Sequence, residues 1–274
     1  MTNFTYRAAT FLSEDTFVLA NLRHNDLEIM RLVGSNNANT ENAIRMVNKL
    51  ALPALRTGCS LVSMTCRTDS VHVSDKKWYR EVADSSIRSA PSCSRRPIRV
   101  ENVLRCDPNK SLVQFKMYIQ NDNLNPGQVA NFSFVTHRET LLHCADLSLD
   151  FQGGIDFQGV PWNAWGPHTT RWSSSDEIDE AWSASVAGQR QAVVVGEQPR
   201  RFRVRDYNVK LLRRVDRESQ TRVVTESIAT PHQMCFLEDI RSSLPYVEME
   251  SDRKYSYDGV LIDETSIIGL TVSK

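Results

Sequence analysis

Short runs in which apolar and polar residues alternate recur along this chain, and they predict β-strands. In the clearest run, residues 112–119, every second position is a large apolar residue: Val113, Phe115, Met117 and Ile119. The alternate positions are Leu112, Gln114, Lys116 and Tyr118. Because successive side chains of a strand point to opposite faces, this period of two is typical of a strand with one buried face. Similar or weaker runs predict strands at 8–12, 16–20, 27–32, 46–52, 60–66, 98–104, 131–136, 182–186, 191–195, 202–207, 222–226, 247–249, 259–262 and 267–272.

Turn-forming residues separate these runs. Residues 121–127 are rich in Asn, Pro and Gly, and residues 187–190 (Ala-Gly-Gln-Arg) are typical of a hairpin turn. Residues 43–55 also fit a helical pattern, but Pro53 and the strand-rich neighbourhood favour a strand there. One short helix is predicted at residues 137–145.

The series of roughly fourteen short strands, with at most two short helices, predicts an all-β fold. Sandwiches, barrels and propellers all have this signature; at four strands to a blade, a propeller would have about three to four blades. We expect a single domain over residues 1–274. Residues 67–97 are polar and have few side chains to bury, so we predict that they form a surface insertion.

Charge and cysteine usage exclude some classes of protein. Lys+Arg and Asp+Glu both number 33, so the formal net charge is zero, which argues against a protein that coats nucleic acid or an anionic membrane. No apolar run approaches the length that spans a bilayer, and the N-terminal residues do not resemble a secretory signal. The six cysteines are too sparse for a disulfide scaffold, so we expect reduced thiols in a cytoplasmic or nuclear protein.

Residues 162–172 hold three of the five tryptophans: Trp162, Trp165 and Trp172. One interpretation is an exposed aromatic platform that binds a peptide, with Arg171 as a further anchor, since Trp and Arg are typical binding residues. The other is that the tryptophans fill the gaps between propeller blades, with Gly166-Pro167 turning the chain. Large aromatic side chains dominate buried cores, which favours the second interpretation.

Residues 200–217 carry eight basic side chains against two aspartates. Strand alternation places Arg201, Arg203 and Arg205 on one outer face, with Phe202 and Val204 pointing inward. This face has the chemistry to bind an acidic or phosphorylated partner. The zero net charge favours a solvated strand face instead, answered by acidic residues of the last third of the chain.

We find no catalytic motif and no metal-binding or cofactor-binding motif. The cysteine and histidine spacings fit none of the common zinc patterns, and the glycines of residues 152–159 lack the spacing of a nucleotide loop. No nucleophile motif occurs. An alternative hypothesis is a hydrolase on a β-scaffold that uses scattered residues: His143, Asp146, His168 and Asp176.

Several motifs occur in an order that resembles a known family. They are Trp165-Gly166-Pro167-x-x-x-Arg171-Trp172, Gly188-Gln189-Arg190, Val204-Arg205-Asp206-Tyr207-Asn208, Ser242-Ser243-Leu244-Pro245-Tyr246 and Asp263-Glu264-x-x-Ile267-Ile268-Gly269-Leu270. Together they resemble the C-terminal region of the expanded F-box-like proteins of mushroom-forming fungi. In the first half of the chain, Phe11-Leu12-x-x-Asp15-x-Phe17-Val18-Leu19-Ala20 and Leu52-Pro53-x-Leu55 fit the same pattern.

The resemblance implies a WD-repeat-like β-propeller, here partial or irregular. It also implies a non-enzymatic scaffold that presents a protein target to a cullin–RING ubiquitin ligase, which an F-box would recruit. An F-box is helical, whereas residues 1–45 are predicted to form strands, so we expect a truncated or F-box-less relative, which has a ligase adaptor as partner only if an F-box lies upstream. An inactive gene remnant is a further alternative. We expect no cofactor, nucleic-acid partner or membrane partner.

Overall fold

A computed structural model describes residues 6–33, 43–68, 107–122, 129–147, 159–174, 184–196, 199–208, 221–226, 228–230, 235–263 and 266–271. Within these residues the fold is mostly β, as predicted, with seventeen strands, two α-helices and one 3-10 helix. The strands form several antiparallel sheets, and no described sheet closes on itself.

The first sheet is a four-stranded meander of consecutive strands. Its strands are β1 (Tyr6–Phe11), β2 (Thr16–Asn21), β3 (Asp26–Val33) and β4 (Ala43–Ala51), in the order β1-β2-β3-β4. The turn from β2 to β3 is fixed locally: the Asn21 side-chain oxygen accepts hydrogen bonds from the backbone N–H groups of Arg23 and His24. Asn25 completes the turn in the left-handed region, with φ of 53°, which Asn tolerates better than most residues.

The second sheet is again a four-stranded meander, ordered β5-β6-β7-β8. Its strands are β5 (Cys59–Thr68), β6 (Leu112–Asn121), β7 (Val129–His137) and β8 (Thr170–Ser174). The 3-10 helix η1 (Pro108–Lys110) precedes β6. Two α-helices, α2 (Arg138–Leu147) and α3 (Trp162–Thr169), occur between β7 and β8 in the sequence.

The third sheet has five strands in the order β12-β15-β11-β10-β9. They are β9 (Ala184–Ala187), β10 (Arg190–Val195), β11 (Arg201–Asp206), β12 (Thr221–Val224) and β15 (Tyr246–Glu250). Two small hairpins accompany it: β13 (Ile228–Thr230) with β14 (Ile240–Ser242), and β16 (Gly259–Ile262) with β17 (Ile267–Leu270).

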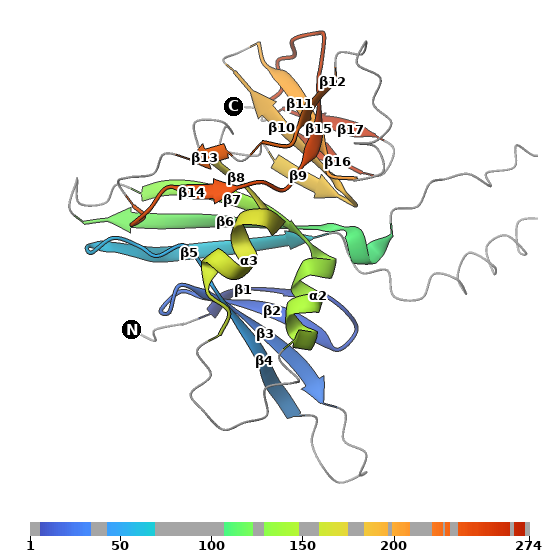
Figure 1. Cartoon of the computed structure of the whole chain (residues 1–274). Helices are drawn as coiled ribbons and strands as arrows, with labels where there is room; N and C mark the ends of the chain where they lie inside the picture. Colours follow the sequence, from blue (N-terminus) through green and yellow to red (C-terminus); the bar gives the residue numbers. More distant parts are fainter. Residues whose placement is uncertain are drawn as a thin grey trace, which may run out of the picture.

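The three sheets are stacked, with the second sheet in the middle (Figure 1). The largest hydrophobic core lies between the first and second sheets and contains the predicted inward row of β6. A smaller core lies on the opposite face of the second sheet, where Leu112 and Val135 pack with Tyr207 and Tyr246 of the third sheet region. On the far face of the third sheet, Ala192 and Val194 pack with Val260 of β16, together with the half-buried Phe202 and Ile262.

Two segments later in the sequence pair with β4 and with the connection that follows it. Val160 forms a parallel bridge with Leu50, and its backbone bonds to Lys49 and Ala51 on the edge of β4 at 2.7 and 2.9 Å. Residues 235–237 pair with residues 54–56, which connect β4 to β5. The last strand of the first sheet and the connection to the second sheet are therefore bonded through the main chain to residues far along the sequence.

Most predicted strands are confirmed, and so is the helix at 137–145, which is α2. The count of roughly fourteen strands is too low, because β8, β13 and β14 were not predicted. The strand predicted at 98–104 lies outside the described residues. So does the predicted insertion at 67–97, except Arg67 and Thr68, which belong to β5.

No helix among the described residues is both long enough and apolar enough to cross a membrane.

Candidate functional site

The tryptophan block is a helix followed by a strand, so the prediction that Gly166-Pro167 turns the chain is wrong. Residues 162–169 form α3, and Pro167 lies inside it. Glycine is required at position 166 for a steric reason. The indole ring of Trp162 lies over the Gly166 backbone, and a Cβ on residue 166 would overlap that ring. The helix ends where the hydroxyl groups of Thr169 and Thr170 donate to the backbone oxygens of Trp165 and Gly166.

The three tryptophans belong to the core between the first and second sheets. Trp165 is 4% exposed and Trp172 is 2% exposed, while Trp162 is half-buried. The Trp162 ring meets both others edge to face, at centroid distances of 5.3 and 5.7 Å. Trp172 also stacks on Phe134, and the Trp165 indole N–H donates to the backbone oxygen of Ala51 at 2.9 Å. This burial matches the core interpretation and leaves Trp165 and Trp172 unavailable as a surface platform.

Arg171 is buried between the second and third sheets and is 2% exposed. Its guanidinium donates to the backbone oxygens of Leu244 at 3.0 Å, Ser242 at 3.2 Å and Glu226 at 3.3 Å. It also lies over the Tyr246 ring, 5.0 Å from the centroid. Because its donors are used on main-chain oxygens, Arg171 connects β8 to the segments around β14 and does not present a surface anchor.

Arg201, Arg203 and Arg205 do share one face of β11, but only part of that face is exposed. Arg205 is 5% exposed, since this end of β11 packs against β8. It donates to the Glu248 carboxylate at 3.2 Å and to the Ser173 hydroxyl at 2.9 Å. The expectation that Arg205 lies on a solvated outer face is therefore wrong.

Arg201 and Arg203 are more accessible and share the Glu250 carboxylate at 2.9 and 2.7 Å. Hydrogen bonds from Arg203 and then Arg201 hold the pKa of Glu250 below its usual value. The pairing register explains the arrangement, because Arg203 lies opposite Glu250 and Arg205 lies opposite Glu248. The arginines of this face thus form ion pairs with acidic residues of β15, in the last third of the chain, as the alternative interpretation predicted.

No hydrogen bond or ion pair joins the described residues suggested for hydrolysis to one another, and His143 is an exposed residue of α2, as is Asp146. His168 contacts the Ser243 hydroxyl at 3.1 Å, but Ser243 donates to the Pro167 backbone oxygen at 3.0 Å. Among the described residues no carboxylate is bonded to His168, so the pair lacks the third group that orients a catalytic histidine. Asp146 of α2 is paired with Arg31, and Asp176 lies outside the described residues. Ser243 was quoted in the sequence motifs, but no spacing signal connected it to His168.

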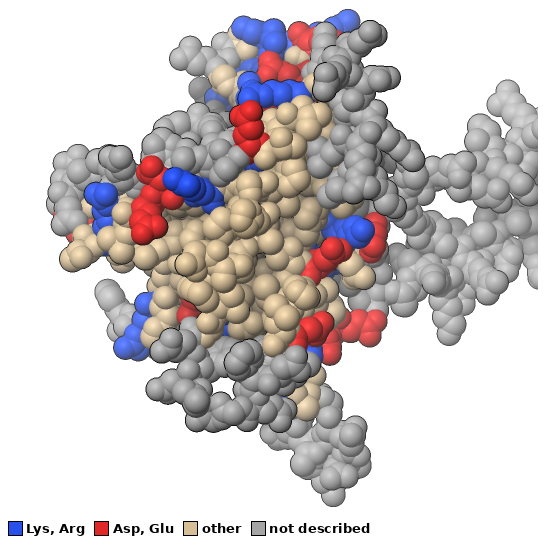
Figure 2. All heavy atoms as spheres, in the orientation of Figure 1, with Lys and Arg blue, Asp and Glu red and all other residues tan. Residues whose placement is uncertain are grey.

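The surface over α3 is the candidate site. Figure 2 shows a broad central area without Lys, Arg, Asp or Glu, in the region where α3 lies in Figure 1. α3 itself contains no Lys, Arg, Asp or Glu. Its exposed residues and its exposed N-terminal neighbour are Pro161, Asn163, Ala164 and His168. The sequence indicated this segment as a possible binding platform, but through Trp162, Trp165, Arg171 and Trp172, and not through the residues that are exposed.

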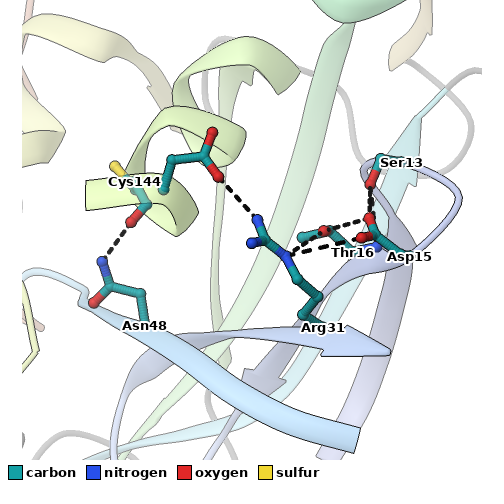
Figure 3. A network of polar contacts seen from close by, with 7 residues as sticks. Ser13, Asp15, Thr16, Arg31, Asn48 and Cys144 are labelled. Atoms are coloured by element: carbon teal, nitrogen blue, oxygen red, sulfur yellow. Dashed lines mark hydrogen bonds and ion pairs between the residues drawn. The ribbon is translucent and has the colours of Figure 1, made fainter. Parts of the chain in front are cut away.

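A polar network holds α2 against the first sheet, at the border of this face (Figure 3). Arg31 of β3 donates to Asp146 at 2.9 Å and lies 4.0 Å from Asp15. The Ser13 hydroxyl, followed by that of Thr16, lowers the pKa of Asp15. In addition, the Asn48 side-chain amide donates to the backbone oxygen of Cys144 at 2.6 Å. Charges therefore gather at the outer end of α2, while α3 keeps an uncharged surface.

Comparison with known proteins found no matching family model, no matching curated protein and no matching solved structure. Among the described residues, no group of three or more His, Cys, Asp and Glu side chains is placed to hold a metal ion.

Proposed function

We propose that this protein is a non-enzymatic scaffold that binds another protein through the surface over α3. The observation that carries the proposal is the uncharged, exposed surface of α3 in the middle of a charged molecule (Figure 2). The cores of protein–protein interfaces are depleted of charged residues in the same way. The helix is also well anchored, since Trp162 and Trp165 fix its inner side in the core. A preorganised surface loses little conformational entropy when a partner binds.

The order of the strands supports a partial WD-repeat-like propeller as the underlying architecture. β1 to β4 form one four-stranded antiparallel meander, β5 to β8 form a second, and β9 to β11 begin a third sheet in the same manner. A blade of a propeller is such a meander, and neighbouring blades pack face to face. The first and second sheets pack through a common core, which is consistent with two adjacent blades.

In this proposal the bound protein is a ligase target, and the chain resembles the target-recognition region of fungal F-box-type adaptors. The place of action is the cytoplasm or the nucleus. Recruitment of the ligase would need an F-box, which the first 45 residues do not resemble. The proposal therefore separates target binding, assigned to this chain, from ligase recruitment.

The test is quantitative capture of partners from a fungal lysate with the wild-type chain and two charge variants. Ala164→Arg places a charge on the exposed surface of α3. Leu261→Arg is the matched control, since Leu261 is an exposed residue of β16, on the far side of the third sheet. We expect Ala164→Arg to reduce recovery of the main partner by about tenfold or more, and Leu261→Arg to leave it unchanged.

Thermal unfolding of both variants shows whether the fold is intact. If the Ala164→Arg variant recovers as much of a reproducible partner as the wild-type chain does, the binding site is not on α3. Absence of any reproducible partner would overturn the scaffold function itself. Recovery of cullin–RING subunits with the same chain would show that ligase recruitment is retained after all.

A further inference from the structure

The connection between the first and second sheets brings two cysteines together. Leu55 forms an antiparallel bridge with Phe236, and the Arg56 N–H donates to the Cys235 backbone oxygen at 2.9 Å. On its other side, the Arg56 backbone oxygen accepts from the Cys59 N–H, also at 2.9 Å. Residue 56 is therefore bonded to both cysteines through its main chain.

The side chains of these cysteines are also neighbours. The Cys59 thiol is near enough to raise the pKa of Cys235, and Cys59 packs against the core between the first and second sheets that contains Cys235. Cys235 is 3% exposed, whereas Cys59 is half-buried at the start of β5. One thiol of the pair is thus nearer to solvent than the other.

We propose that Cys59 and Cys235 form a reversible disulfide when the protein meets a low-molecular-weight disulfide such as oxidised glutathione. Formation of the bond would attach residues 235–237 covalently to the start of the second sheet. In the reduced protein that attachment depends on two backbone hydrogen bonds, between Arg56 and Cys235 and between Leu237 and Ala54, and on the burial of Phe236. This inference does not depend on the proposed function.

The chemistry proceeds by two thiol–disulfide exchanges. The Cys59 thiolate attacks one sulfur of the small disulfide, which forms a mixed disulfide and releases one small thiolate. The Cys235 thiolate then attacks the Cys59 sulfur, forms the Cys59–Cys235 bond and releases the second small thiolate. Overall, two protein thiols are oxidised, one small disulfide is reduced to two thiols, and the two protons pass to the released thiolates.

The burial of the two thiols assigns their roles. Cys59 is the more accessible and is the one that an external disulfide reaches first. Burial, followed by the neighbouring Cys59 thiol, raises the pKa of Cys235 to about 11. A thiol with a high pKa is seldom ionised near neutral pH, so the second exchange is expected to be the slow step and to accelerate as the pH rises.

The experiment uses the full chain with Cys93→Ser and Cys106→Ser, which removes two cysteines outside the described residues. The protein is incubated with oxidised glutathione, alkylated, digested without reduction and examined by mass spectrometry. We expect a linked peptide pair that contains Cys59 and Cys235, and a rise of about 5 °C or more in the midpoint of thermal unfolding. Dithiothreitol should reverse both changes.

Two single-cysteine variants make the result specific. Cys66→Ser is the matched control, since Cys66 is a half-buried thiol on the same strand, β5, and this variant should retain the linked peptide and the thermal shift. Cys59→Ser, at the more accessible position, should lose both. The proposal is overturned if glutathione stays attached to Cys59 with no linked peptide, if the linkage joins other cysteines, or if Cys59→Ser shows the same thermal shift.

Discussion

Residue 166 is a glycine because the side chain of another residue fills the space that its own Cβ would need. The Trp162 indole lies where a Cβ of residue 166 would be, and this contact lets Trp162 meet Trp165 and Trp172 edge to face. Glycine is usually destabilising inside a helix. In α3 the loss is offset by the burial of a large aromatic ring against the helix backbone.

Gly166→Ala should therefore destabilise the protein, although helix propensity alone predicts a gain in stability. Alanine favours the helix, but its methyl group displaces the Trp162 ring, so we expect the free energy of unfolding to fall by about 2–3 kcal/mol. Urea unfolding measures the change. In a Trp162→Leu background the same substitution should be much less harmful, and equal losses in both backgrounds would argue against the steric explanation.

Asp26, the first residue of β3, is a buried carboxylate with an unfavourable environment. It is 9% exposed, and one of its carboxylate oxygens has no hydrogen-bond partner. Burial, followed by the nearby Glu28 charge, raises the pKa of Asp26. The folded state thus favours the protonated form, so the contribution of Asp26 to stability declines as the pH rises through the folded-state pKa.

Asp26→Asn should stabilise the protein at neutral pH by about 1 kcal/mol, because it removes the buried charge. The gain should shrink as the pH falls through the folded-state pKa toward 4, where the wild-type carboxyl group takes up its proton. Chemical unfolding at several pH values between 7 and 4 gives the comparison. The exposed Asp252→Asn is the control, and a gain for Asp26→Asn that is independent of pH would contradict this account.

The pairing of β11 with β15 places charges opposite one another across two strands. Arg205 faces Glu248 in a buried setting, where their side chains are 6% and 12% exposed, whereas Arg203 faces Glu250 at 35% and 32%. The two rungs of this ladder have the same chemistry but differ in burial. Loss of a carboxylate from the buried rung leaves an arginine charge that water reaches poorly.

Glu248→Gln should lower the free energy of unfolding by about 2–3 kcal/mol, and Glu250→Gln by less than about 1 kcal/mol. The Glu250 variant is the matched control, since its two arginines remain accessible to water. Urea unfolding at low and high salt distinguishes the two ion pairs, because salt screens the exposed pair at Glu250 more strongly than the buried pair at Glu248. Equal losses for the two variants would show that burial does not set the strength of this ladder.

Local pattern predicted much at this scale, but not everything. The alternation in β6 identified both a strand and its buried face, since Val113, Phe115, Met117 and Ile119 all belong to the core. The three-residue strands β13 and β14 are too short to show a period. In α3, Gly166-Pro167 signals a turn in sequence, and only the position of the Trp162 ring explains why the helix continues through it.

Over the whole molecule, contacts distant in sequence decide which sites are exposed. Arg205 is on the predicted face of its strand, but the stacking of the third sheet on the second buries that face. The uncharged surface over α3 arises for the same reason, because it exists only once α3 is packed between distant segments. Phe236, which is fully buried, illustrates the dependence: it meets Phe132 and Trp172 edge to face.

Phe236→Ala should destabilise the protein by about 3–5 kcal/mol, because it leaves a cavity in the core between the first and second sheets. Its neighbour provides the control: Leu237 is 59% exposed, and Leu237→Ala should change stability by less than about 0.5 kcal/mol. Tryptophan fluorescence follows unfolding in both variants. If Phe236→Ala were as harmless as Leu237→Ala, residues 235–237 would not contribute to joining the two sheets.

The bridge between Leu50 and Val160 has a consequence for biosynthesis. A ribosome releases β1 to β4 long before residue 160, so the first meander emerges from the exit tunnel with one edge incomplete. During that interval the open edge is accessible to chaperones and to neighbouring nascent chains. Translation speed between codons 51 and 160 should therefore influence how much of the newly made protein reaches the native state.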